Sequence, residues 1–237
     1  MKRFCLALLA MATALAITPA ASASTIAWTD WNSATAGNPG TASGTMGGIT
    51  VTYAGQTSGL GSVYAPSIGQ TLYPGYGHTN WGPSTSYVGG DVGNAPPTNY
   101  NSVALEGGSD ISESITFSSF VTDPVIAIWS LGQGGTTAAF DFSEAFSIVA
   151  CGPSDEYGGG CITESSDNVL GVEGNGVIEF NGTYSSLTFT TPDSENWYAF
   201  TVGEPTPEPS SLLLLGTGLL GLAFVAFRKA KASGLTF

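Results

Sequence analysis

Short apolar and aromatic runs, separated by turn residues, recur along the chain between residues 49 and 203. None shows the 3.6-residue period of an amphipathic helix, and β-branched and aromatic residues are frequent within them. Such runs, bounded by Gly, Pro, Asn, Asp and Ser, are typical of the strands of all-β domains. The runs cover 49–53, 102–107, 111–117, 124–131, 138–142, 145–150, 168–174, 176–182, 184–190 and 196–203. The pattern predicts an all-β fold, an antiparallel β-sandwich or jelly roll.

Three runs predict local detail. Residues 124–131 are apolar on both faces, which indicates a central strand covered on each side. Leu187 and Phe189 are two positions apart, so they share the inward face of their strand. The pair Asn175-Gly176 favours positive φ angles and predicts the tight turn of a β-hairpin.

Two long segments lack the strand pattern. Residues 32–48 are rich in Gly, Ser, Thr and Ala and are expected to form a loop or a flexible edge. Residues 73–99 are expected to form a loop, because Gly and Pro recur throughout them. Long segments without secondary structure are unusual in compact domains and are often functional, so a ligand site is expected in 73–99.

The N-terminus has the organisation of a secretory signal peptide. Lys2 and Arg3 precede an apolar stretch, and the sequence Ala-Ser-Ala at 21–23 offers small residues for cleavage. We expect residues 1–23 to be removed after Ala23. An uncleaved N-terminal anchor is the alternative.

The C-terminus carries a second apolar stretch. Residues 211–227 contain no charge, which predicts a transmembrane helix at the short limit of length. Residues 228–237 contain basic side chains and are expected to form a cytoplasmic tail by the positive-inside rule. A β-sandwich ectodomain over 24–203 and a Pro-rich linker over 204–210 complete the predicted organisation.

The charges are distributed very unevenly. All five Lys and Arg residues lie outside residues 24–206, whereas 17 of the 18 acidic residues lie inside them. Without Lys or Arg, residues 24–206 have no such cationic side chain to contact phosphate groups, so nucleic acid is excluded as a partner. The excess of carboxylates makes calcium a candidate ligand, because calcium takes oxygen ligands. Dispersed acids that only keep the protein in solution are the alternative, and no other cofactor is expected.

Cys151 and Cys161 are the cysteines that remain after signal-peptide removal. They flank a Gly- and Pro-rich segment, and in an oxidising compartment such a pair predicts a disulfide that closes a loop. A metal site would need two further soft ligands, and the single histidine, His78, cannot supply both.

Candidate chemistry favours binding over catalysis. His78 lies in no nucleophile motif, so a Ser-His-Asp hydrolase is not indicated, and two-carboxylate glycosidase chemistry rests on the abundance of acids alone. The expectation is that the protein is not an enzyme. An aromatic cluster instead resembles the rings on which lectins stack sugars. It consists of Tyr73, Tyr76, Trp81 and Tyr87. Rings that only pin the loop to the sheet are the alternative.

The end of the chain combines three elements in a fixed order. Pro207-Glu208-Pro209 stands before the apolar stretch, and Arg228-Lys229 follows it. This order resembles the PEP-CTERM sorting signal of Gram-negative bacteria. A plain anchor behind a Pro-rich linker is the alternative.

The resemblance implies recognition by exosortase, a membrane-embedded cysteine protease and transpeptidase. It also implies processing near Pro207-Glu208-Pro209, with passage from the inner membrane to the cell surface or extracellular matrix. The predicted function is therefore that of an exported structural protein of the surface or biofilm matrix, with polysaccharide as a candidate partner. A lectin-like module assisted by calcium is the alternative.

Overall fold

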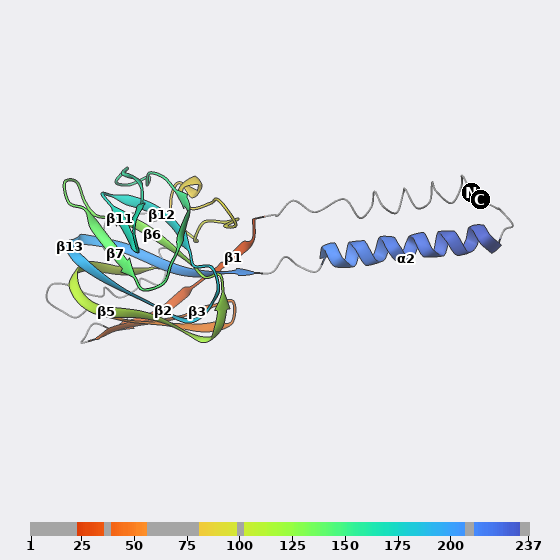
Figure 1. Ribbon diagram of the computed structural model, residues 1–237, viewed down its shortest axis with the longest axis horizontal. Helices are drawn as coiled ribbons and strands as arrows, with labels where there is room; N and C mark the ends of the chain where they lie inside the picture. Colours follow the sequence, from red (N-terminus) through yellow and green to blue (C-terminus); the bar gives the residue numbers. More distant parts are fainter. Residues whose placement is uncertain (1–22, 36–38, 56–80, 99–101, 207–210, 233–237) are drawn as a thin grey trace. The chain divides into compact units, whose positions relative to one another are not determined.

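The computed structural model describes residues 23–35, 39–55, 81–98, 102–206 and 211–232 (Figure 1). Ala23–Thr206 forms one compact unit, here called the body. Its lower limit lies within one residue of the predicted signal-peptide cleavage point, and its upper limit immediately precedes Pro207. The signal peptide itself, Tyr73, Tyr76 and residues 207–209 lie outside the described residues.

The body is built from strands and one short 3-10 helix. The strands are β1 (Thr25–Trp28), β2 (Asp30–Thr35), β3 (Gly40–Met46), β4 (Ile49–Gly55), β5 (Val103–Thr122), β6 (Val125–Leu131), β7 (Ala138–Phe142), β8 (Ser147–Cys151), β9 (Gly160–Cys161), β10 (Thr163–Ser165), β11 (Asn168–Gly171), β12 (Gly174–Glu179) and β13 (Thr183–Thr206). The 3-10 helix is η1 (Ser84–Ser86). The all-β prediction is confirmed.

Two long strands organise the sheet. β5 and β13 pair along most of their lengths, and irregularities between Phe189 and Tyr198 interrupt the register. The main path runs β10-β11-β7-β13-β5-β4-β3-β2, while β6 joins β13 to β12, and β12 pairs β8. Among the described strands every pairing is antiparallel apart from β9 with β12. Because β13 changes neighbours from β7 to β6 and then β1, the sheet folds over a common core.

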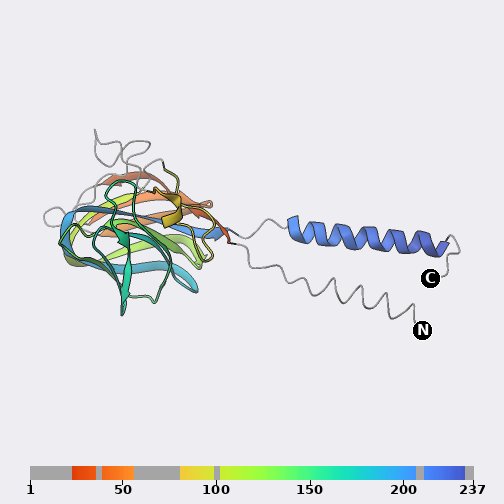
Figure 2. The same ribbon diagram turned by 90° about the horizontal axis from the view of Figure 1, so that it is seen from above.

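The result is a β-sandwich-like arrangement of two layers. Figures 1 and 2 show β2, β3 and β5 on one side of the core and β6 and β12 on the other. Apolar and aromatic side chains fill the space between the layers, and Phe140 contacts the rings of Phe142, Phe189, Tyr198 and Phe200. Burial of such large rings is a main source of stability in a domain without Lys or Arg.

β6 is covered on both faces, as its sequence predicts. Every residue from Val125 to Leu131 is buried. Ile126 and Ile128 face the core between the layers, whereas Ala127 and Trp129 belong to a second apolar cluster on the outer face. Residues 81–98 supply the cover of that outer face. The predicted inward position of Leu187 and Phe189 is also confirmed, since both are buried in the core.

Two local predictions are wrong. Asn175 and Gly176 do not form a hairpin turn, because both lie within β12, which pairs β6 and β8 rather than β11. Residues 40–46 are not a loop but the strand β3, in which small buried residues alternate with more exposed Ser and Thr. Most of the buried positions of β3 carry Gly or Ala, so the alternation of buried and exposed residues cannot be recognised from large apolar side chains. The edge position is correct, since β2 ends the main path of the sheet.

The C-terminal stretch is helical. α2 runs from Ser211 to Ala232 and includes the residues for which a transmembrane helix is predicted. In the part of the chain that the structure describes, no helix has both the length and the hydropathy needed to cross a bilayer. The helix is therefore confirmed, and the membrane span is not.

Candidate functional site

The first candidate site is the end of the body, where the chain continues into the sorting signal. Thr25 pairs with Thr206, and Trp28 pairs with Gly203, in an antiparallel register. The hydroxyl of Thr206 donates a hydrogen bond to the carbonyl of Thr25 at 2.7 Å. We call β1 together with residues 203–206 the terminal strand pair. Both ends of the body therefore leave the sheet side by side.

Asn94 holds β1 from its other side. Its Oδ1 accepts a hydrogen bond from the amide of Ile26 at 2.6 Å, and its Nδ2 donates to the carbonyl of Ile26 at 3.2 Å. The indole Nε1 of Trp28 donates to the carbonyl of Asn94 at 3.1 Å. An asparagine side chain that takes both main-chain groups of one residue replaces a strand neighbour.

The predicted sorting residues are divided by the described range. Pro207, Glu208 and Pro209 lie outside it, immediately after the terminal strand pair. Arg228 and Lys229 belong to α2, and Arg228 is exposed to solvent. Their role in sorting stays a prediction from the sequence.

The predicted disulfide is present. Cys151 at the end of β8 is bonded to Cys161 in β9, ten positions along the chain. Asn175 of β12 supports the same region, because its buried side chain donates to the carbonyl of Glu173 at 2.8 Å and accepts from the amide of Ser130 at 2.8 Å. The loop is thereby joined to the centre of the sheet by a covalent bond and by a buried amide.

Trp81 and Tyr87 of the predicted glycan cluster lie in the second apolar cluster. Tyr87 is fully buried and Trp81 is 1% exposed, and their rings meet edge to face at 5.3 Å. Neither ring face is open to solvent, and sugar binding by the cluster as a whole, which includes Tyr73 and Tyr76, stays a prediction. Their packing against Trp129 and Ala127 of β6 fits the alternative, in which the rings pin the segment to the sheet.

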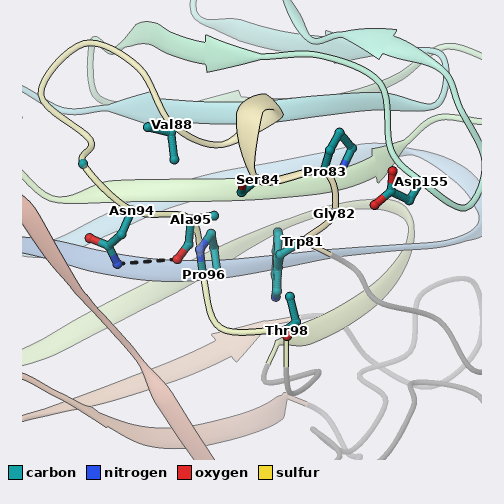
Figure 3. A pocket seen from close by; sticks show the side chains of 11 residues that line it. Trp81, Gly82, Pro83, Ser84, Val88, Asn94, Ala95, Pro96, Thr98 and Asp155 are labelled. Carbon is teal, nitrogen blue, oxygen red and sulfur yellow. Dashed lines mark hydrogen bonds between the residues drawn. The ribbon is translucent and has the colours of Figure 1, made fainter.

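A pocket of about 640 Å³ opens beside this aromatic pair (Figure 3). Apolar walls come from Trp81, Pro83, Val88 and Pro96, all within the segment predicted to hold a ligand. Asp155 from the disulfide loop is an acidic residue of its wall. In Figure 3, Trp81 stands beside Pro96, and Asp155 lies beyond Pro83.

The indole Nε1 of Trp81 is buried and has no hydrogen-bond acceptor among the described residues. Because this atom is closed to solvent, the pocket itself offers apolar surface and a carboxylate, which is chemistry suited to a neutral ligand carrying hydroxyl groups.

Two carboxyl groups are buried in the body. Glu113 of β5 is fully buried and accepts hydrogen bonds from the hydroxyls of Tyr53 and Thr191. Glu195 of β13 is 8% exposed, and its Oε1 accepts the amide hydrogen of Gly132 at 2.7 Å. Hydroxyl and amide donors here take the place of the cations that the body lacks.

Burial raises the pKa of Glu195 from 4.5 to about 8. The hydrogen bond from Gly132 opposes the increase, and the nearby carboxylate of Glu173 adds to it. Glu195 is thus mainly protonated at neutral pH. In the described residues no group of three or more His, Cys, Asp or Glu side chains is arranged to hold a metal ion, and the calcium hypothesis therefore gains no support from them.

The residues that position these sites are mostly ones that the sequence does not single out. Asn94 and Gly203 carry no motif, and their importance depends on partners far away in the chain.

Comparison with known proteins finds a match for the C-terminal segment of the chain. A family model described as the PEP-CTERM protein-sorting motif matches residues 205–229. No curated protein matches the chain, and no solved structure matches it. The motif implies an exported protein that exosortase processes. The chain therefore carries a PEP-CTERM sorting motif at residues 205–229, and its body is not assigned to a family.

Proposed function

We propose that this chain is a non-enzymatic structural protein of the bacterial cell surface or extracellular matrix. The observation that carries the proposal is the PEP-CTERM motif at 205–229, which begins where the compact body ends. A body with a disulfide and without Lys or Arg suits an extracellular location, since disulfides persist in oxidising compartments.

Before processing, the C-terminal segment holds the chain at the inner membrane. This part of the proposal is supported by the uncharged stretch 211–227 and by the basic residues that follow it. Exosortase then separates the body from this segment near Pro207-Glu208-Pro209. The body passes to the surface or matrix and loses Arg228 and Lys229 with the segment.

Glu208→Ala tests the proposal, and Glu164→Ala, an exposed acid on β10, is its matched control. Proline has no amide hydrogen, so neither neighbour of Glu208 offers a backbone donor, and its carboxylate is the charged group offered for recognition. In cells that produce Glu208→Ala, the protein in the membrane fraction should lose its signal peptide but keep its C-terminal segment, as read from its intact mass. Wild type and Glu164→Ala should be shortened. Normal shortening of Glu208→Ala would contradict the proposal.

A lectin-like role is the second candidate, and the pocket beside Trp81 is the observation that favours it. We propose that the pocket binds the hydroxyl groups of a neutral polysaccharide, with Asp155 as acceptor. An anionic polysaccharide would find no cationic side chain in the body. Calcium assistance belongs to this candidate.

Polysaccharide pull-down with and without calcium separates the two candidates. Asp155→Asn removes the charge and should weaken binding about tenfold, the usual effect of one polar contact in a site. Asp167→Asn, an exposed acid outside the pocket, should bind as wild type does. Absence of binding to any neutral polysaccharide would leave the structural role alone.

A further inference from the structure

We propose that the terminal strand pair sets the upstream limit of C-terminal processing. The folded body withholds residues 203–206 from a protease, so that C-terminal cleavage falls after Thr206. The protection of these residues depends only on the structure of the body. That exosortase is restricted by it rests on the proposed function.

Main-chain pairing is the physical basis of this limit. A protease binds its substrate as an extended strand and uses the amides and carbonyls of the substrate for hydrogen bonds. In residues 203–206 β1 takes these groups on one side, with Thr25 opposite Thr206 and Trp28 opposite Gly203. Upstream, Val202 pairs with Ile126 of β6, and its carbonyl accepts from Thr29 at 2.8 Å. Binding of these residues by a protease requires β1 to leave.

β1 does not leave easily, because it is held on both sides. Asn94 takes the amide and the carbonyl of Ile26. The amide of Ser24 donates to the carbonyl of Asp91 at 2.8 Å, and the amide of Gly93 donates back to the carbonyl of Ser24 at 2.9 Å. Segment 91–94 therefore acts as a second partner strand for the start of the body, and the hydrogen bonds must break together for β1 to open.

Gly203 shows how closely the two strands fit. A Cβ atom on Gly203 would overlap Cγ2 of Ile26 and would lie 2.8 Å from Cε3 of Trp28. The side chains of β1 thus cover the backbone of β13 directly, and any side chain at this position pushes β1 outward. Gly134 provides a matched control, since a Cβ there meets nothing within 4 Å and its φ is not positive.

The two strands of the terminal strand pair come from opposite ends of the body, so the processing limit also depends on folding. Thr25 and Thr206 are 181 positions apart, so their pairing is among the contacts that need almost the whole body to be exported. A body that has not finished folding offers residues 203–206 as additional substrate. The terminal strand pair therefore makes the cleavage position depend on a completed fold.

The bond change itself is ordinary acyl transfer. The peptide bond after Thr206, or after one of the residues that follow it, breaks at its carbonyl carbon. The carbonyl carbon gains a bond to water or to an acceptor amine, and the released segment keeps the nitrogen as a new amino terminus. No oxidant or reductant takes part. The body contributes no catalytic residue and only restricts which bond is reached.

Limited proteolysis of the full chain in detergent tests the protection without exosortase. With a protease of broad specificity, the resistant fragment of wild type and of Gly134→Ala should end at or after Thr206, as read by intact mass. Gly203→Ala should give fragments ending at or before Val202. Asn94→Ala, a milder change, should increase such shorter fragments about tenfold, as expected when hydrogen bonds that resist local opening are lost. Wild-type fragments that routinely end before Thr206 would overturn the proposal.

Intact-mass analysis of the protein matured in its host tests the link to exosortase. Wild type and Gly134→Ala should show one C-terminus, at Thr206 or beyond it, whereas Asn94→Ala should add C-termini at residues 203–205. If Asn94→Ala alters proteolysis in detergent while its mature C-terminus matches that of wild type, the pair protects the body but does not set the processing limit. If wild type is never shortened in the host, the proposed function fails while the proteolysis result still stands.

Discussion

Glu195→Gln is expected to remove most of the pH dependence of stability of the body. Glu195 is a carboxyl group with 8% of its surface exposed, and the body contains no Lys or Arg to compensate its charge. Gln keeps an oxygen that can accept the amide hydrogen of Gly132, but it carries no charge at any pH. The variant therefore separates the cost of the charge from the contribution of the hydrogen bond.

The sign follows from the two pKa values. The pKa of Glu195 is about 8 in the folded body against 4.5 without the fold, so the folded state binds the proton more tightly. Its contribution is fully present below pH 4.5, declines from there, and is lost as the pH passes 8. At 1.36 kcal/mol per pH unit the whole interval corresponds to about 5 kcal/mol, an upper value for a group with some access to solvent.

Such a loss is large for a domain, because total stabilities are about 5–15 kcal/mol. For a body of this size each kcal/mol moves the midpoint of thermal unfolding by about 2–4 °C. We expect the midpoint of wild type to fall by about 10–20 °C between pH 5 and pH 9. Burial also raises the pKa values of Glu179 and Glu204, and both add to the decline in the same direction.

Thermal unfolding of the full chain, followed by near-ultraviolet circular dichroism at constant salt, measures the effect. Glu195→Gln should match wild type within about 1 kcal/mol at pH 5 and exceed it by about 3–5 kcal/mol at pH 9. Glu164→Gln, on exposed β10, should follow wild type throughout. A wild-type midpoint that is unchanged from pH 5 to pH 9, or a decline of the same size in Glu195→Gln, would refute the reasoning.

Two further predictions concern the disulfide and the core. Reduction of the bond between Cys151 and Cys161, or the double substitution by Ser, should destabilise the body by about 2–3 kcal/mol, because the bond removes the loop-closure entropy of a short loop. A reductant should lower the thermal midpoint of wild type but not that of the double variant. Phe140→Ala should cost about 3–5 kcal/mol in denaturant unfolding, because it leaves a cavity among packed rings. Phe120→Ala, with 72% of its side chain exposed, should change stability by less than about 0.5 kcal/mol, and equal losses at the two positions would contradict the assigned core.

Features that depend on near neighbours in the chain were predicted from the sequence. The apolar composition of 124–131 predicts a strand buried on both faces, and β6 is one. The close spacing of Cys151 and Cys161 predicts their bond. The order of Pro-Glu-Pro, apolar stretch and basic pair predicts the sorting motif that the family model confirms. In each case the relevant residues lie within about 30 positions of one another, and the signal is local.

Features that depend on distant partners required the tertiary structure. Asn175-Gly176 has the composition of a turn, yet pairing with β6 and β8 keeps both residues in a strand and buries the amide. Trp81 and Tyr87 have the composition of a sugar platform, yet β6 covers their rings. Local propensity is worth a fraction of a kcal/mol per residue, and the burial of a large ring or a satisfied amide outweighs it.

The sequence by itself determined the fold class, the disulfide and the sorting motif at the C-terminus. The tertiary structure alone decided that Thr206 is paired with Thr25 and that Glu113 and Glu195 are buried without a cation. Strand alternation specifies that a residue points inward, but not which residue it meets there. That choice is made when segments far apart in the chain come together, and the start and the end of the body meet in this way.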